Sequence, residues 1–439
     1  MGRRTGSGGK EGGVNIAVFG LGKLGAPLAA VLASKGHCVH CHDINVDFVQ
    51  AIEHGESPVD ETGLAELITA NRQNLIAELD GLAAARGADI VMIIVPTPSD
   101  ATGKFSAAYA VSACKVIGTA MSAGNGYKLI VLVSTVMPGT MEAKIIPALE
   151  KASNKKAGRD FGVCYNPEFI ALGSVIHDML NPDFVLIGES DPVAGGLLEE
   201  FYYTLHTSPI VRMSLVDAEL AKLCLNCYIT TKISYANMLG ELCEHTPGAD
   251  ANVVTAAIGL DRRVGRRYLK PATAYGGPCF PRDNRALRYH AQSVGVDLAI
   301  PEATETINKR QTPRLAEIVA SHTRAGERVA VLGIAYKPDT SVVEESAAVA
   351  LLQYLTDRGY YCSYYDPQHR GTVPGAPRAD SLATCLRNAD TAVIMTAWPE
   401  FIHLPPPETD GVTIIDPWGL VDATMLPATA TYVRPGLGS

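Results

Sequence analysis

The stretch VNIAVFGLGKLGAPLAAVLASKGHCVHCHD, residues 14–43, decides how the chain begins to fold. Its apolar run Val14–Phe19 predicts a buried strand, which the glycine-rich turn GLGKLG follows at once. Residues 26–34 have the composition of a helix, and residues 37–42 predict a second strand. Strand, glycine turn, helix and strand in this order are the unit that opens a doubly wound α/β domain.

The glycines of this turn and an aspartate after the second strand predict a dinucleotide site. Gly20, Gly22 and Gly25 permit the turn, the close approach of a pyrophosphate and tight packing of the helix. Asp43 stands 23 residues after Gly20, where a carboxylate can bind the adenosine ribose hydroxyls. Because Asp43 would repel a 2′-phosphate and no arginine follows it closely, we expect NAD rather than NADP. The alternative is an ordinary glycine turn.

Further buried strands are predicted at residues 90–95, 129–133 and 161–165. They run into the polar turns PTP, STVMPGT and NPEF, in that order. Ligands of open α/β sheets lie beyond the carboxyl ends of the strands. We therefore expect Thr97 and Thr135 to face the cofactor crevice.

A long helical pattern runs from about residue 214 to residue 244, before Pro247 and Gly248. Lys222 and Asn226 are four residues apart and share one face of this helix. Ordinary surface polarity is the default interpretation of such a pair.

A second α/β pattern follows the linking segment 301–311. Strands are predicted at residues 328–332, 360–365 and 392–396, with a helix from about residue 346 to residue 358. This half lacks a full glycine fingerprint, so we expect it to bind the part of a substrate that does not react.

The stretch TAYGGPCFPRD, residues 273–283, places Cys279 after a glycine turn and before a predicted helix N-terminus. Such a position lowers the pKa of a thiol and favours the nucleophilic thiolate. Gly276 and Gly277 allow a tight turn or the close approach of a ligand. A buried cysteine in a proline-bounded turn is the competing interpretation.

The bulk composition predicts a soluble globular protein of about three domains. Of the 439 residues 47% are hydrophobic and 19% are charged. A net charge of −9 argues against nucleic-acid or anionic-membrane partners. Residues 1–13 contain two arginines without a following apolar core, which predicts a flexible tail rather than a signal peptide. No later run is long and apolar enough to span a bilayer.

Ten cysteines without a secretion signal suggest free thiols and a cytoplasmic location. Residues 38–42, CVHCH, match a haem-attachment pattern, and Cys224 with Cys227 forms a second C-x-x-C that could complete a zinc site. We reject both sites, because the first pair lies on a predicted strand and the second inside a predicted helix. We therefore expect no metal.

Taken in order, these motifs resemble those of the UDP-glucose/GDP-mannose dehydrogenase family. The similar region runs from residue 14 to about residue 420. It includes GLGKLGAPLA with Asp43, GESPVDETGL, VPTP, STVMPGT, NPEF, AELAKLCLNCY, GLDRRVG, YGGPCFPRD, VLGIAYKPDT, YYDP and TAWPEF.

The resemblance implies two Rossmann-like doubly wound domains joined by a long central helix and a small helical domain. We expect an NAD-binding domain at residues 14–205, and a central domain for dimerisation and the catalytic loop at 206–311. A nucleotide-sugar (UDP) domain is expected at 312–439. The central helix would supply the interface of a homodimer or a higher homo-oligomer.

The family oxidises the C6 alcohol of a nucleotide sugar twice with NAD, ending at the acid. The resemblance makes Cys279 the nucleophile, which forms a thiohemiacetal and then a thioester. Lys222 and Asn226 would donate to the oxygen where charge grows. Lys222 and Asp283, through an ordered water, would handle the first proton transfer.

The resemblance also assigns the hydrolytic step and the ligand contacts. Glu168 would activate water and Thr135 would position it. The implied cofactor residues are Gly20, Gly22, Leu24, Gly25, Asp43, Thr97, Thr135 and Arg282. The implied substrate residues are Glu168, Phe169, Ile170, Lys222, Asn226, Arg263, Tyr268, Tyr275, Gly276, Phe280 and Lys337. Of these, Lys337 would meet the diphosphate and Arg263 would reach the sugar across a dimer.

Several positions depart from the usual family pattern. Where PEFLREG is common, Ala171 and Leu172 replace charged residues. The other departures are Pro278 for serine, Arg282 for lysine, Glu344 for arginine, and Asp416, Pro417 and Trp418 at the usual acidic-glycine-arginine turn. They indicate a divergent subgroup and leave the substrate open.

The leading prediction is the oxidation of UDP-glucose to UDP-glucuronate. The other substrates considered are UDP-N-acetylglucosamine, UDP-N-acetylmannosamine and GDP-mannose. A two-electron hydroxyacid dehydrogenase would leave Cys279 and the second α/β half unexplained. A non-catalytic nucleotide-sugar sensor would not need Lys222, Asn226, Cys279 and Asp283 together.

Overall fold

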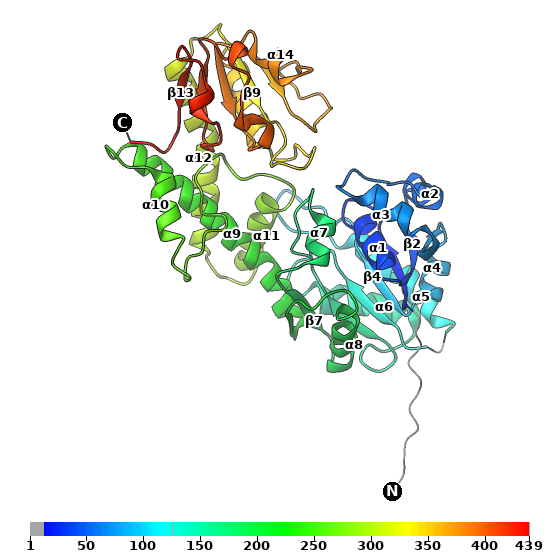
Figure 1. The fold of residues 1–439 in the computed structure, drawn as a ribbon. Helices are drawn as coiled ribbons and strands as arrows, with labels where there is room; N and C mark the ends of the chain where they lie inside the picture. The colour runs from blue at the N-terminus through cyan, green and yellow to red at the C-terminus, as the bar shows by residue number, and fades with distance from the viewer. Residues whose placement is uncertain (1–12, 125, 439) are drawn as a thin grey trace. The chain divides into compact units, whose positions relative to one another are not determined.

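The computed structural model describes residues 13–124 and 126–438 (Figure 1). The chain divides into two compact units, Met1–Lys222 and Leu223–Ser439. The predicted tail, residues 1–13, lies outside the described residues except for Gly13.

The first unit is built on one eight-stranded sheet. Along the sheet the strands are β3 (Leu75–Glu78), β2 (Cys38–His42), β1 (Asn15–Phe19), β4 (Ile90–Ile93), β5 (Leu129–Leu132), β6 (Gly162–Tyr165), β7 (Val185–Glu189) and β8 (Ile210–Ser214). Neighbouring strands are parallel except for the antiparallel pair β6 and β7. The order from β3 to β6 is that of a dinucleotide-binding sheet.

Helices cover both faces of this sheet, because its central strands are apolar on both sides. Ile16 and Val18 of β1 belong to one core and Ala17 and Phe19 to the other. The first core includes residues of α1 (Gly25–Ser34), α2 (Val46–His54), α3 (Leu64–Ala70), α7 (Val175–Leu180) and α8 (Pro192–Tyr202). The second includes residues of α4 (Gly81–Gly87), α5 (Ala108–Ser122), η2 (Met141–Ile145) and α6 (Ile146–Ser153).

The second unit contains a five-stranded sheet. Its strands, in order, are β10 (Tyr361–Tyr365), β9 (Arg328–Leu332), β11 (Thr391–Ile394), β12 (Thr413–Ile415) and β13 (Thr431–Val433), and all neighbours are parallel. One face packs on α12 (Ala299–His322) and α13 (Ala347–Thr356). The other face packs on α14 (Leu382–Leu386) and on residues 398–404.

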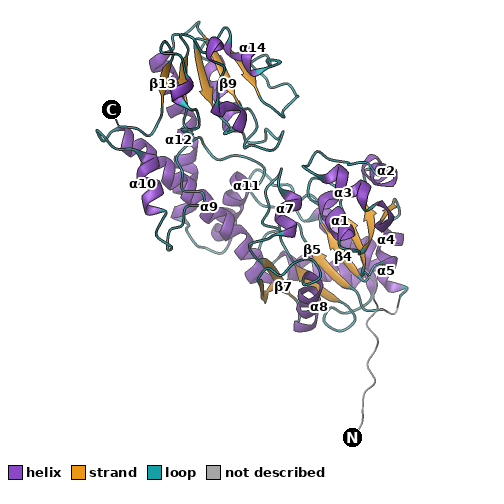
Figure 2. Cartoon of the chain, in the orientation of Figure 1, coloured by secondary structure: helices purple, strands orange, loops and turns teal. Residues whose placement is uncertain are grey.

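The remaining helices include the long α9 (Leu215–Glu244), α10 (Ala251–Ile258) and α11 (Phe280–Ser293) (Figure 2). The two doubly wound sheets and the long helix confirm the predicted fold class. Helix α12 runs on past residue 311, so that predicted domain limit falls inside a helix. The three domain ranges remain predictions. Within the described ranges, no helix combines the length and apolarity that crossing a membrane requires.

Candidate active site

The turn between β1 and α1 leaves its backbone open at Gly22. Gly20 has φ +106°, and an added Cβ there would lie 2.3 Å from the carbonyl oxygen of Ile94. An added Cβ on Gly25 would lie 1.9 Å from the carbonyl oxygen of Gly20. At Gly22, by contrast, an added Cβ would meet no atom within 4 Å. The first and third glycines are therefore needed for packing, while the second keeps space where a pyrophosphate can approach.

Asp43 lies directly after β2 and binds the glycine turn. Its Oδ2 accepts a hydrogen bond of 2.6 Å from the backbone N–H of Leu21, and its Oδ1 accepts one of 2.7 Å from that of Asn45. The carboxylate is thereby held beside the turn, as a ribose-binding residue requires. Leu24 is the N-cap of α1. The residues present thus fit a dinucleotide.

The turns after β4 and β5 are joined by hydrogen bonds. The Thr97 hydroxyl donates to the carbonyl oxygen of Thr135 over 2.7 Å. The Ser134 hydroxyl donates to the carbonyl oxygen of Val95 over 2.7 Å and accepts from its N–H over 2.8 Å. The structure therefore brings Thr97 and Thr135 together at the carboxyl edge of the sheet, and their contact with the cofactor stays a prediction.

Glu168, Phe169 and Lys222 form one cluster in the first unit. The Lys222 ammonium donates to the carbonyl oxygen of Glu168 over 2.7 Å and lies 4.6 Å from the centroid of the Phe169 ring. Burial raises the pKa of the Glu168 carboxyl to about 7, against the opposing effect of Lys222. A carboxylate with this pKa is suited to take a proton near neutral pH.

Buried side chains fix the turn that carries Glu168. The Asn166 amide donates to the carbonyl oxygen of Leu186 over 2.9 Å, and the Tyr202 hydroxyl donates to the Asn166 amide oxygen. Glu61 accepts from the N–H groups of Gly173 and Val175, at 2.8 and 3.0 Å. Glu61 thus holds the start of α7, where the loop that begins after Glu168 ends.

One of the two apolar departures after Glu168, Leu172, has a packing explanation. Ile170 and Leu172 are partly buried against the core that contains α1 and α7. Leu172 therefore contributes to packing at a position where the family often has a charged residue.

Glu219 is a functional candidate that the sequence predictions missed. Its side chain is fully buried and accepts from the N–H groups of Gly139 and Met141, at 2.6 and 2.8 Å. Burial raises the pKa of this carboxyl to about 7, although the backbone hydrogen bonds oppose the shift. Glu219 thereby joins the loop that begins at Thr135 to helix α9.

In the second unit, Cys279, Asn226 and Asp283 form a second cluster. Cys279 is exposed and is the N-cap of α11. The buried Asp283 lies in the first turn of that helix, where its N–H donates to the carbonyl oxygen of Cys279 over 2.8 Å. The Asn226 amide donates to Oδ2 of Asp283 over 2.6 Å. Asn226 and Asp283 therefore fix the first turn of the helix that presents the thiol.

Two asparagines that the sequence predictions missed hold the backbone before Cys279. Asn237 accepts from the N–H of Ala272 over 2.8 Å and donates to the carbonyl oxygen of Thr273 over 3.1 Å. Asn308 accepts from the N–H of Tyr275 over 2.8 Å and donates to its carbonyl oxygen over 3.0 Å. Each amide satisfies one donor and one acceptor of the loop.

Tyr275 is held by its hydroxyl as well as by its backbone. The buried Asn284 amide donates to that hydroxyl over 3.0 Å and to the Thr230 hydroxyl over 2.8 Å. Burial raises the pKa of Tyr275 well above its ordinary value, so the phenol is neutral at physiological pH. Its ring meets that of Phe280 edge to face, with 6.3 Å between centroids.

Gly276 and Gly277 lie against the segment that follows β9. An added Cβ on Gly276 would lie 2.1 Å from the carbonyl oxygen of Glu345. Gly277 has φ +83°, and its added Cβ would lie 2.5 Å from the Tyr336 ring. Its N–H donates to the carbonyl oxygen of Glu344 over 3.0 Å. Both glycines are therefore required here, and Glu344 contributes a backbone contact that does not depend on its side chain.

Helix α9 buries several polar residues beside apolar ones, and it exposes several large apolar side chains. The buried polar face, each residue three or four positions from the next, consists of Glu219, Lys222, Asn226, Thr230, Ser234 and Asn237. Exposed residues of the same helix include Tyr228, Tyr235, Met238 and Leu242. Extending the Lys222 and Asn226 face by steps of three and four would have identified Glu219 and Asn237 from the sequence.

Three other predicted ligand residues, Phe280, Arg263 and Arg282, have contacts within the second unit. Phe280 contacts Tyr268 as well as Tyr275, with 6.2 Å between the centroids of Tyr268 and Phe280. Arg263 is exposed and forms an ion pair of 2.6 Å with Asp261. Arg282 follows Pro281 in α11, and its Nε lies 3.8 Å from Oδ1 of Asp283.

Lys337 lies in the turn after β9. Its ammonium donates to the carbonyl oxygen of Pro338 over 3.1 Å. The turn includes Asp339, which has φ +61°. Lys337 thus occupies the carboxyl edge of the second sheet, where ligands of such sheets bind.

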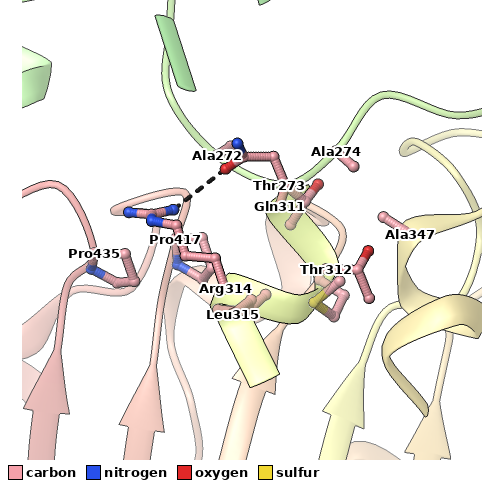
Figure 3. Close-up of a pocket in the computed structure, with 11 residues that line it drawn as sticks. Ala272, Thr273, Ala274, Gln311, Thr312, Arg314, Leu315, Ala347, Pro417 and Pro435 are labelled. Atoms are coloured by element: carbon pink, nitrogen blue, oxygen red, sulfur yellow. Dashed lines mark hydrogen bonds between the residues drawn. The ribbon is translucent and has the colours of Figure 1, made fainter. Parts of the chain in front are cut away.

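A small hollow with room for about one water molecule, partly open to solvent, lies beside the loop that leads to Cys279 (Figure 3). Thr273 and Arg314 line it, and Arg314 donates to the side-chain oxygen of Gln311 over 3.3 Å. Met395 and Pro417, which follow β11 and β12, also line it. The hollow therefore lies at the carboxyl ends of parallel strands.

None of the ten cysteines, all of which lie within the described residues, forms a disulfide. Cys224 and Cys279 are exposed, Cys38 is partly buried, and the other seven are buried. Among the described residues, no cluster of three or more His, Cys, Asp or Glu side chains could hold a metal ion. Cys38 and Cys41 lie on β2, while Cys224 and Cys227 lie on α9.

Three family models match this chain in the order expected from its motifs. They describe the UDP-glucose/GDP-mannose dehydrogenase family: its NAD binding domain (residues 14–206), its central domain (216–310) and its UDP binding domain (330–423). The cofactor is therefore NAD, as the glycine turn and Asp43 predicted.

Relatives of known activity cover most of the chain. UDP-glucose 6-dehydrogenase TuaD of Bacillus subtilis is 34% identical over 88% of this chain and 84% of its own length. GDP-mannose 6-dehydrogenase of Pseudomonas syringae is 36% identical over 80% of this chain and 81% of its own.

The solved structure of a UDP-glucose dehydrogenase from Pyrobaculum islandicum has a TM-score of 0.89 and 29% identity. It covers 98% of this chain and 100% of its own. The glycine turn with Asp43, the three matched domains and these relatives lead to one conclusion: the chain belongs to the UDP-glucose/GDP-mannose dehydrogenase family and is an NAD-dependent nucleotide-sugar 6-dehydrogenase.

Proposed function

We propose that the protein oxidises UDP-glucose to UDP-glucuronate with two molecules of NAD, through a covalent intermediate on Cys279. The observation that carries this proposal is the exposed thiol at the N-cap of α11, one helical turn before Asp283, which binds Asn226. A two-electron dehydrogenase would not need a nucleophile at this position.

The first oxidation removes a hydride and a proton from the C6 alcohol. NAD accepts one hydride in each of the two oxidations. Lys222 and Asp283, through a water molecule, take the hydroxyl proton. Lys222 and Asn226 donate hydrogen bonds to the C6 oxygen as its negative charge grows. The product of this step is an aldehyde.

Cys279 retains the aldehyde for the second oxidation. Its thiolate adds to the C6 carbon, and the resulting oxyanion takes a proton to give a thiohemiacetal. Loss of that proton and of the remaining C6 hydrogen as hydride gives a thioester. The covalent bond keeps the aldehyde from leaving between the two oxidations.

Hydrolysis of the thioester completes the reaction. Glu168, with its pKa raised to about 7, takes a proton from a water that Thr135 positions. The oxygen of this water attacks C6, the carbon–sulfur bond breaks, and the Cys279 thiolate is released with the acid. The burial that raises the pKa of Glu168 supports its role as a base near neutral pH.

We assign binding of the nucleotide half of the substrate to the second unit. Lys337 is the group that would meet the diphosphate, and Arg263 is the group that would meet the sugar. Similarity to UDP-glucose 6-dehydrogenases supports the uridine nucleotide. GDP-mannose is the second candidate, because relatives with that activity reach 36% identity.

We also propose that two copies associate through α9 and α10. Tyr228, Tyr235 and Leu242 recur every seven residues on α9 and are 62, 45 and 61% exposed. Val253 and Leu260, in and after α10, are 64 and 66% exposed. Large apolar groups repeated along one helix face are typical of helices that pack against a partner. Ten cysteines without a disulfide support a reducing compartment such as the cytoplasm.

The reaction is tested by incubating the protein with NAD and a panel of nucleotide sugars. The panel contains UDP-glucose, GDP-mannose, UDP-N-acetylglucosamine and UDP-N-acetylmannosamine. We expect NADH formation to be fastest with UDP-glucose, with about two NADH per sugar consumed. A ratio near one for every active sugar would contradict the four-electron reaction. A preference for GDP-mannose would move the assignment to the second candidate.

A further inference from the structure

The segment after α10 concentrates positive charge in a chain whose net charge is −9. Residues 261–270, DRRVGRRYLK, contain four arginines, one lysine and a single acidic residue. We call the side chains of Arg262, Arg263, Arg266, Arg267 and Lys270 the cationic loop. All five are exposed. Arg263 pairs with Asp261, whereas among the described residues Arg262, Arg266 and Lys270 form no ion pair.

Specific contacts hold this segment in one conformation. The Lys232 ammonium donates to the carbonyl oxygens of Val264 and Gly265, at 3.0 and 3.1 Å. Leu269 is buried, and Tyr268 has φ +61°. A non-glycine residue with this φ persists only where its surroundings hold it. The positive charges are therefore carried on a fixed loop rather than on a solvated tail.

The cationic loop lies beside the catalytic loop within the same unit. The Tyr268 ring meets the Phe280 ring edge to face, with 6.2 Å between centroids and 80° between planes. Phe280 directly follows Cys279. Positive charge is thus concentrated close to the thiol.

The arrangement has an electrostatic cost. Like charges spaced a few residues apart repel one another. A nucleotide sugar carries two negative charges on its diphosphate, so an acidic protein repels it at long range. A local positive surface can overcome this repulsion and raise the rate of capture by about 10- to 1,000-fold.

We propose that Arg262, Arg266 and Lys270 capture the dianionic nucleotide sugar electrostatically and direct it to the loop that carries Cys279. This inference rests on the proposed function. It gives these three residues a role in association that is separate from the sugar contact assigned to Arg263. Ordinary solvated surface charge is the alternative, and it predicts no effect on substrate capture.

The test compares two triple variants with the same change in net charge. In one, Arg262, Arg266 and Lys270 are replaced by glutamine. In the matched control, the exposed Lys115, Lys144 and Lys151 of the first unit are replaced by glutamine. Steady-state rates are measured for the nucleotide sugar and for NAD between about 20 and about 300 mM salt, because the Debye length shortens over that range.

We expect the loop variant to lose about tenfold in kcat/KM for the nucleotide sugar at low salt, with kcat within about twofold of wild type. Its kcat/KM should also fall less steeply with salt than that of wild type. The control variant should retain the wild-type salt dependence. Circular dichroism and thermal unfolding establish that both variants are folded.

Equal salt dependence in the loop variant and wild type would overturn the inference. So would a loss of kcat/KM that appears only when NAD is the varied substrate, or an equal loss in the control. A wild-type protein that reduces no NAD with any nucleotide sugar contradicts the proposed function instead. The two failures are therefore distinguishable.

Discussion

At the scale of single residues, the position of Cys279 separates its chemistry from that of the other cysteines. Seven cysteines are buried, and burial raises the pKa of Cys41, Cys164 and Cys227 well above the ordinary value for a thiol. Those thiols stay protonated at neutral pH. Cys279 is exposed at a helix N-cap, where backbone N–H groups and the helix dipole favour a thiolate.

We predict that Cys279→Ser lowers the rate of NADH formation from UDP-glucose by at least about a thousandfold, because a hydroxyl cannot replace the thiolate. NAD binding should be unchanged, since the dinucleotide turn lies in the other unit. Initial rates and NAD titration by fluorescence check both expectations. Uronic acid formation at the normal rate would exclude the covalent mechanism.

Glu168→Gln should isolate the hydrolytic step. Wild-type kcat should rise as the pH increases through about 7, because the carboxylate becomes available as a base only above its pKa. The variant should lose about 100- to 1,000-fold in kcat and also this pH dependence. It should still release a burst of about two NADH per active site before stopping at the thioester. Rapid-mixing absorbance measurements detect the burst, and a variant without it would assign Glu168 to an earlier step.

At the scale of elements, α9 buries a row of polar side chains among its apolar ones. Its buried polar groups have partners: Glu219 accepts from two backbone N–H groups, and Asn226 and Asn237 donate to Asp283 and Thr273. Burial of a polar group is tolerated when its hydrogen bonds are made. Hydrogen bonds from the buried polar face therefore help to fix how α9 packs against its neighbours.

Glu219→Gln tests how much the stability of the protein depends on the buried carboxyl group of α9. Folding raises the pKa of Glu219 from 4.5 to about 7, so the folded state favours the neutral form. Its contribution to stability is complete below about pH 4.5 and is lost as the pH rises through about 7. The free energy of unfolding of wild type should therefore fall by about 3 kcal/mol from this group over that range.

The measurement is urea unfolding of wild type and variant at several pH values between about 4.5 and about 8. We expect the difference between the two proteins to change with pH, because glutamine does not titrate. Glu142→Gln, at an exposed neighbour, serves as the control and should leave that pH dependence in place. A constant difference between wild type and the Glu219 variant would show that this group does not titrate on folding.

At the scale of the whole molecule, the hydrophobic pattern predicted the central strands of both sheets. Residues 90–95 and 328–332 correspond to β4 and β9, because strands buried on both faces are continuous apolar runs. The half-exposed β8 lacks such a run and was missed. Pro313 lies inside α12, whereas a proline ordinarily indicates the end of a helix.

The site residues within each unit were named from the sequence because their motifs are local in it, and their roles remain predictions. Asn308 was missed, since it binds backbone groups more than 30 residues away. A single sequence does not indicate which asparagine will pair with which loop. Glu219 differs, because its place on the Lys222 face of α9 follows from helical spacing alone.

The proposed dimer gives a prediction for the assembled molecule. Replacing Tyr235 and Leu242 by glutamate should convert the dimer to monomer, because two charges would be buried in an apolar interface. Sedimentation velocity measures the mass. Ile44→Glu, at an 86% exposed apolar residue of the first unit, should leave it unchanged. If the double variant keeps the wild-type mass, the interface lies elsewhere.

Because most cysteines are buried, labelling of the exposed thiols can measure the fraction of active molecules in a sample of native protein. Of ten thiols, only Cys224 and Cys279 are exposed, so an alkylating reagent has two principal targets. A nucleotide sugar bound at the catalytic loop should protect Cys279, while association through α9 should protect Cys224. Mass spectrometry of the labelled peptides would then report active-site occupancy and subunit association separately, in one unmodified sample.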